Sequence, residues 1–122
     1  MDLQSRLDAD ALEAQKLTRK HFVVGLNFSV ESLRELDPLC DDASFVLPGG
    51  KNEANMELLT RVWGAYLGEV LRRASDGAWT ETAEGVTLHV AGKTLDPFAR
   101  VRLRLQEGAE HSLIAYATEA LG

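Results

Sequence analysis

The sequence predicts an α+β fold, a single compact domain in which a long central helix packs on a small antiparallel sheet with flanking helices. Three observations lead to this prediction. The run from Asn55 to Ser75 has an apolar arc roughly 240° wide, at about 100° per residue, which is typical of a largely buried helix. The stretch after it alternates around Glu84 and Gly85 as in a β-hairpin. Helical patterns precede and follow these two segments.

Length and composition place residues 1–122 in one globular domain. With 45% apolar and 26% charged residues and a mean hydropathy of -0.14, the chain matches average globular proteins, which argues against disorder. Its apolar runs are far shorter than the roughly 20 residues that span a membrane, so we expect no membrane association. Cys40 is the single cysteine and permits no intrachain disulfide, which fits a cytoplasmic location; we expect it to fill an apolar gap.

The first part of the chain contains two helical patterns joined by a short segment. Apolar residues recur at helical spacing over residues 1–20, and we expect this amphipathic helix at the periphery of the domain. Side chains alternate from residue 22 to 28, a pattern typical of a strand or an extended entry segment. Ser29 is suited to cap the helix that follows, which either ends before Pro38 or bends there, because proline lacks an amide proton.

Residue types that start and stop helices delimit the remaining elements. The expected caps are, in chain order, Asn52 or Asn55, then Asp76 with Gly77, Asp96 with Pro97, and Gly108. A last helix is expected over residues 109–121.

The charge balance bears on partners and cofactors. A net charge of -6 opposes binding to a phosphate backbone, so we expect no nucleic-acid partner. Alternating arginines diverge around the helix that carries them, and we interpret them as solvated surface: Arg100, Arg102 and Arg104. The three histidines are scattered, so we expect no metal site, and no motif calls for a cofactor.

Glu69 raises the question of function, because it lies on the apolar face of the central helix. A buried carboxylate is either paired and hydrogen-bonded or takes up a proton. In one interpretation Glu69 pairs with Arg73, one turn later. In the other it is a general acid or base, or a ligand-binding group, in a pocket lined by Tyr66, Trp63 and Trp79. No second acid, histidine or nucleophile lies at a motif spacing, so we favour the ion pair and assign no catalytic residue.

Two glycines interrupt the central helix at Gly64 and Gly68. Glycine destabilises a helix by about 1 kcal/mol relative to alanine, so both indicate close approach of another element. That element belongs either to the same chain or to a second copy in a homodimer of paired central helices.

Three sequence runs resemble a group of small bacterial proteins, a domain of unknown function. They are WGAYLGEVLRR over residues 63–73, GAW over residues 77–79 and LDPFARVRLRLQEG over residues 95–108. The resemblance covers roughly residues 26–120 and implies an α+β arrangement and a bacterial origin. It implies no activity, cofactor or catalytic residue.

Three functions are open. We favour a non-catalytic binding or interaction protein of the bacterial cytoplasm, because no catalytic constellation is found and the net charge is acidic. The second is a small enzyme or ligand-binding domain that uses Glu69 beside its aromatic neighbours. The third is an immunity-type protein that neutralises a toxin, because an acidic domain can mask a basic surface.

Overall fold

The computed structural model describes residues 2–122 and confirms the predicted α+β class. The helices are α1 (Leu3–Phe22), α2 (Leu33–Val46), α3 (Glu53–Ser75), α4 (Pro97–Glu107) and α5 (Leu113–Leu121). The strands are β1 (Ala78–Thr82), β2 (Gly85–Val90) and β3 (Lys93–Leu95). Short 3-10 turns precede α2 (Val30–Ser32) and α5 (Ala109–His111). The sheet is antiparallel, with β2 between β1 and β3.

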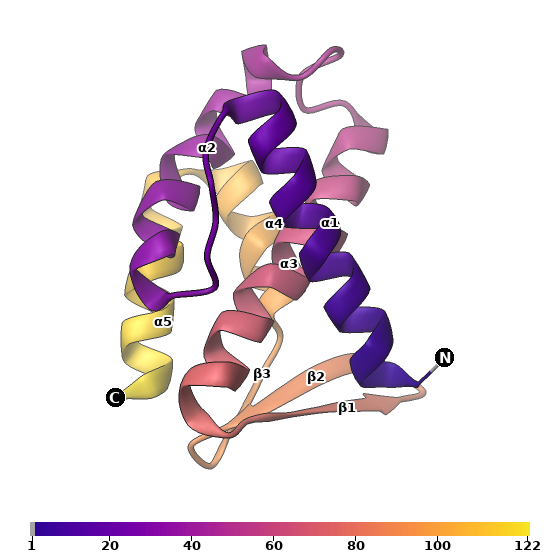
Figure 1. Ribbon diagram of the computed structural model, residues 1–122, viewed down its shortest axis with the longest axis vertical. Coiled ribbons are helices and arrows are strands. Elements are labelled where there is room, and N and C mark those ends of the chain that lie inside the picture. Colours follow the sequence, from indigo (N-terminus) through magenta and orange to yellow (C-terminus); the bar gives the residue numbers. More distant parts are fainter. Residues whose placement is uncertain (1) are drawn as a thin grey trace.

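Helix α3 is the centre of the fold (Figure 1). Helices α1 and α4 pack along it, α2 and α5 pack against each other, and the sheet lies across one end of the helices. Every residue from Val62 to Leu71 is buried, as the broad apolar arc predicts. This central position explains why α3 tolerates so few exposed polar side chains.

Most helix boundaries follow from local capping. Asn52 Oδ1 accepts a hydrogen bond from the amide of Asn55 (2.8 Å) at the start of α3, and Asp96 Oδ1 accepts one from the amide of Ala99 (3.1 Å) at the start of α4. Asp76 ends α3 in the left-handed conformation, with φ 56°. These expected caps are therefore confirmed.

The segment after α1 forms no strand, so the extended connection was the correct alternative. Val23 and Phe28 have positive φ values of 58° and 64°, which a regular strand does not permit. Its backbone instead bonds to side chains of the neighbouring helices: for example, the amide of Phe28 donates to the hydroxyl of Tyr66 on α3 (2.9 Å).

Helix α2 continues through Pro38 to Val46 rather than ending before it. Proline inside a helix costs about 3 kcal/mol because it forgoes a backbone hydrogen bond and crowds the preceding turn. Apolar side chains are buried on both sides of it and offset this cost: Leu33, Leu36, Leu39, Cys40 and Ala43. Tertiary packing thus decides the length of α2.

Two further expectations need correction. The predicted hairpin gains a third strand, because β3 pairs with β2 through Leu95 opposite Leu88. The last helix does not start at residue 109: a 3-10 turn comes first, and α5 begins at Leu113.

The glycines of α3 are accounted for within the chain. A Cβ atom at Gly64 would overlap Phe98 of α4, and one at Gly68 would overlap the indole of Trp79 on β1. This face of α3 is therefore covered by the chain's own α4 and β1. The glycines give no reason to expect a homodimer through this face.

Helix α1 was expected at the periphery of the domain. Its residues Leu7 and Ala11 form a buried cluster with Ala65 of α3. Ala14, one turn further along, belongs to the main core. The helix lies on the outside of the fold and contributes one buried face.

Candidate functional site

Glu69 is the centre of a closed polar cluster between α3, α1 and β1. Its side chain is 0% exposed, and its two oxygens accept five hydrogen bonds. Oε2 accepts from Arg72 Nε (2.7 Å), Gln4 Nε2 (3.0 Å) and Trp79 Nε1 (2.8 Å). Oε1 accepts from Arg72 Nη2 (2.9 Å) and Arg73 Nε (3.2 Å). The lone pairs of this carboxylate are thus engaged by the chain itself.

These contacts decide the protonation state of Glu69. Burial of the carboxyl group raises its pKa, but hydrogen bonds from Arg72, Gln4 and Trp79 outweigh that effect and lower the pKa to about 2. A carboxyl group with this pKa carries no proton near neutral pH. In this arrangement Glu69 is suited to hold charges and donors in place, and it has no proton to donate as a general acid.

The ion pair between Glu69 and Arg73 expected from the sequence is confirmed, but it is the weaker of two. Arg72 binds both carboxylate oxygens at shorter distances and with a fork-like geometry. The helical periodicity places Arg72 in the polar sector of α3, which is why the sequence did not point to it. An arginine side chain is long enough to reach back over one helical turn to the carboxylate.

Tyr66 and Trp63 are fully buried and bond to groups elsewhere. The Tyr66 hydroxyl lies 2.6 Å from Ser32 Oγ and accepts from the amide of Phe28. Trp63 Nε1 donates to Thr18 Oγ1 (3.0 Å). Both rings anchor neighbouring segments to α3, since a buried Tyr or Trp needs a partner for its polar atom.

The aromatic pocket expected beside Glu69 therefore needs correction. Of its three expected rings, Trp79 donates to the carboxylate, whereas Trp63 and Tyr66 pack in the core with other partners. The two surface pockets described below are lined by none of these residues. Gln4 and Arg72 occupy the positions around Glu69 that a ligand would need.

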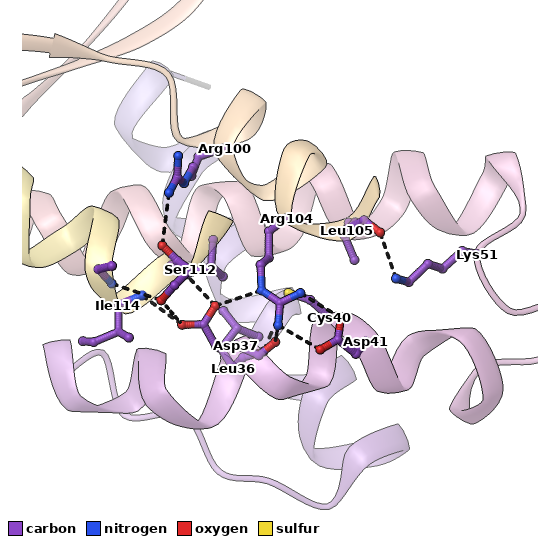
Figure 2. Close-up of polar contacts among 12 residues, drawn as sticks. Leu36, Asp37, Cys40, Asp41, Lys51, Arg100, Arg104, Leu105, Ser112 and Ile114 are labelled. Atoms are coloured by element: carbon purple, nitrogen blue, oxygen red, sulfur yellow. Dashed lines mark hydrogen bonds and ion pairs between the residues drawn. The ribbon is translucent and has the colours of Figure 1, made fainter. Parts of the chain in front are cut away.

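A second buried ion pair joins α4 to α2 (Figure 2). The Arg104 side chain is only 3% exposed. It donates to Asp37 Oδ1 (3.1 Å) and to the Asp37 carbonyl (2.7 Å), and it binds both carboxylate oxygens of Asp41 (2.8 and 3.0 Å). The expectation that Arg104 is solvated surface is wrong, because it lies on the same face of α4 as the buried Val101 and Leu105.

Asp37 also caps α5 from a distance in sequence. Its carboxylate accepts hydrogen bonds from the amides of Leu113 (2.7 Å) and Ile114 (3.0 Å) and from Ser112 Oγ (2.9 Å). A carboxylate at a helix N-terminus satisfies free amides and interacts favourably with the helix dipole. Asp37 and Arg104 together tie α2, α4 and α5 to one another.

Cys40 lies beside this second cluster and is fully buried. Its thiol donates to the carbonyl of Leu36 (3.7 Å), and burial raises its pKa to about 12. The thiolate needed for nucleophilic or metal-binding chemistry is therefore not populated near neutral pH.

Two surface pockets lie outside both clusters. The larger, of about 290 Å³, lies between β3, α4 and α5 and is lined by Lys93, Leu95, Arg100, Tyr116, Glu119 and Ala120. The smaller, of about 120 Å³, follows α1 and is lined by Gly25, Asn27, Ser29, Glu31, Ser32 and Glu35. Only the larger one carries cationic side chains. Arg100, which we expected to be solvated surface, is half-buried, and no sequence pattern places it beside Lys93.

Within residues 2–122, no helix is both long and apolar enough to cross a membrane. In the same described range, no group of three or more His, Cys, Asp or Glu residues could hold a metal ion. Comparisons of the chain with protein-family models, with curated proteins and with solved structures found no match. The resemblance to a bacterial family of unknown function stays a prediction.

Proposed function

We propose that this protein is a non-catalytic interaction protein of the bacterial cytoplasm and that it contacts its partner through the end of α2. The observation that carries this proposal is the exposure of Phe45, whose side chain is 78% exposed on the last turn of α2. The next residue, Val46, is also exposed. Burial of such an exposed phenylalanine against a partner contributes considerably to the free energy of binding, because an aromatic ring can bury roughly 150–250 Å².

Other apolar and acidic groups extend this surface. Val23, at the end of α1, is 85% exposed, and in Figure 1 the ends of α1 and α2 lie at the same end of the molecule. Asp42 stands one turn before Phe45 on α2, where side chains three residues apart are neighbours, whereas the carboxylate of Asp41 is already bound by Arg104. The partner that fits this surface has an apolar socket bordered by lysine or arginine side chains.

The net charge of -6 supports the same class of partner. Long-range attraction between an acidic protein and a basic one accelerates their encounter and weakens as salt is added. A basic toxin is one partner with this chemistry, so toxin neutralisation is retained as a second candidate function. It differs from the first in a testable way, because binding would abolish the partner's own activity.

The experiment compares three immobilised proteins: the parent, Phe45→Ser and the matched control Leu12→Ser. Leu12 is a half-exposed apolar residue on α1, so its substitution removes a similar apolar side chain from another surface. We expect a bacterial protein to be retained by the parent and by Leu12→Ser, and to be lost with Phe45→Ser and at high salt. Native mass spectrometry then gives the stoichiometry of the complex.

Retention that is equal for all three proteins would refute the role of Phe45. A parent that retains no protein and instead converts a small molecule would refute the proposal as a whole. The melting temperature of Phe45→Ser should match that of the parent, because exposed substitutions usually change stability by less than about 0.5 kcal/mol.

A further inference from the structure

We infer that the pocket between β3, α4 and α5 binds a small organic monoanion, a carboxylate with a compact apolar body. The pocket has a volume of about 290 Å³ and combines two cations, one carboxylate and an apolar wall. It involves neither Phe45 nor the end of α2, so this inference goes beyond the interaction surface proposed above.

Arg100 is the residue that points to a ligand. Its Nη2 donates to the carbonyl of Ser112 at 3.4 Å (Figure 2), and its Cζ lies 4.9 Å from the centre of the Tyr116 ring. Its Nε atom is buried and has no hydrogen-bond partner within residues 2–122. A buried N–H of a charged group left without an acceptor is costly and rare. Within residues 2–122 no carboxylate forms an ion pair with Arg100, so an anion in the pocket would be the charge partner of its guanidinium group.

Lys93 provides a second cation at the same pocket. Its ammonium group donates to the carbonyls of Glu119 (2.9 Å) and Ala120 (3.3 Å) near the C-terminal end of α5. An ammonium group has three donors, and these two contacts leave one for a ligand. The carbonyl contacts also hold the side chain in place, so little additional order is lost when a ligand binds.

The other lining groups select the type of anion. Leu95, Ala120 and the ring of Tyr116 contribute apolar atoms to the wall, which favours a ligand with a hydrocarbon or aromatic part. The carboxylate of Glu119 opposes a second negative charge. A guanidinium group matches the planar geometry of a carboxylate. A monocarboxylate therefore fits better than a phosphate dianion, and the volume limits it to a small molecule.

Benzoate is the probe for this site. We titrate it into the isotope-labelled 122-residue protein and follow backbone amide signals by NMR, with sodium chloride added at matched concentration as the control. We expect saturable shifts at Leu95, Tyr116 and Ala120 with a Kd on the order of 1 mM, as is usual for a ligand of this size. Benzamide, which lacks the charge, and inorganic phosphate should each bind at least about tenfold more weakly.

Three variants separate the site from general charge effects. Arg100→Gln should weaken benzoate binding at least about tenfold, and Lys93→Gln about threefold, because its ammonium is partly engaged by the chain. Arg102→Gln removes the same charge from the next arginine along α4, which does not line the pocket, and should leave the Kd unchanged. The amide spectrum of each variant reports whether it is folded. If Arg100→Gln does not fold, Lys93→Gln is the variant that tests the inference.

The inference is overturned if benzoate causes no saturable shifts at these three amides at about ten times the expected Kd. It is also overturned if benzamide or phosphate binds as tightly as benzoate, or if Arg100→Gln and Lys93→Gln, when folded, both bind like the parent. None of these results depends on Phe45 or on a protein partner.

Discussion

Replacement of Glu69 tests how far the buried cluster stabilises the fold. Glu69→Ala removes the acceptor of five hydrogen bonds and leaves the part-buried N–H of Trp79 without its partner. Removing one partner of a buried ion pair typically costs about 3–5 kcal/mol. The lower end applies here, because the side chains of Arg72 and Arg73 are 27% and 41% exposed and can turn toward water. We expect Glu69→Ala to lower the free energy of unfolding by about 3 kcal/mol.

The lowered pKa of Glu69 leads to a similar estimate of the free energy that its carboxylate contributes to folding. A fall from an ordinary value of 4.5 to about 2 corresponds to roughly 3 kcal/mol of stabilisation at neutral pH. Glu69→Gln should cost less than Glu69→Ala, about 2 kcal/mol, because it keeps the volume and one acceptor. Its amide oxygen can take the place of Oε2, which accepts from Arg72, Gln4 and Trp79.

The assay is urea unfolding followed by circular dichroism, with double-mutant cycles that combine Glu69→Ala with Arg72→Ala or Arg73→Ala. The coupling energy should be larger for Arg72, about 2 kcal/mol, than for Arg73, about 1 kcal/mol or less. Arg73 is the more exposed of the two, and its contact is longer. A Glu69→Ala protein as stable as the parent, or a coupling energy near zero with Arg72, would refute the structural role and favour a carboxylate retained for function.

Three further predictions follow from the buried polar groups and the close packing. Because the pKa of Glu69 is lowered in the fold, the stabilisation that its carboxylate gives is complete above about pH 4.5 and is lost as the pH falls toward 2. The urea midpoint should therefore fall more steeply with acid in the parent than in Glu69→Gln. Equal dependence of the two midpoints on pH would contradict this. Arg104→Ala should lower the free energy of unfolding by about 3 kcal/mol, measured in urea, since it leaves Asp37 and Cys40 beside an emptied space. The control Arg102→Ala, at a half-buried position of the same helix, should change it by less than about 1 kcal/mol. Gly68→Ala should destabilise the protein by about 1–3 kcal/mol despite the better helix propensity of alanine, because its Cβ would overlap Trp79; a stabilised variant would show that the indole can move away.

Local physics explains why several elements were predictable. The caps at Asn52 and Asp96 depend on side chains that bond an amide three residues later, and the cap at Asp76 depends on the left-handed conformation of that residue. Adjacent sequence therefore contains the whole interaction in each case. The broad apolar arc of α3 likewise reports its own burial, because a helix with so little polar surface must be covered on several sides. The position of Glu69 on that face was visible for the same reason.

The partners of Glu69 were less predictable. Arg73 was visible as a neighbour one turn away, but Gln4 is 65 residues distant in sequence and Trp79 reaches the carboxylate from β1. These contacts depend on where α1 and the sheet lie against α3. Without that arrangement, the sequence around Glu69 favoured an ion pair with Arg73 but left a pocket open as the alternative.

Periodicity and groups a few residues apart were enough to predict the α+β class, the caps and the buried character of α3. The path of α2 through Pro38, the burial of Arg104 and the pocket shared by Lys93 and Arg100 could not be predicted in this way. In each of these cases the deciding energy comes from packing or ion pairs between elements distant in sequence. A long side chain such as arginine is compatible with solvent or with a buried carboxylate, and only the position of the neighbouring helix determines which it meets.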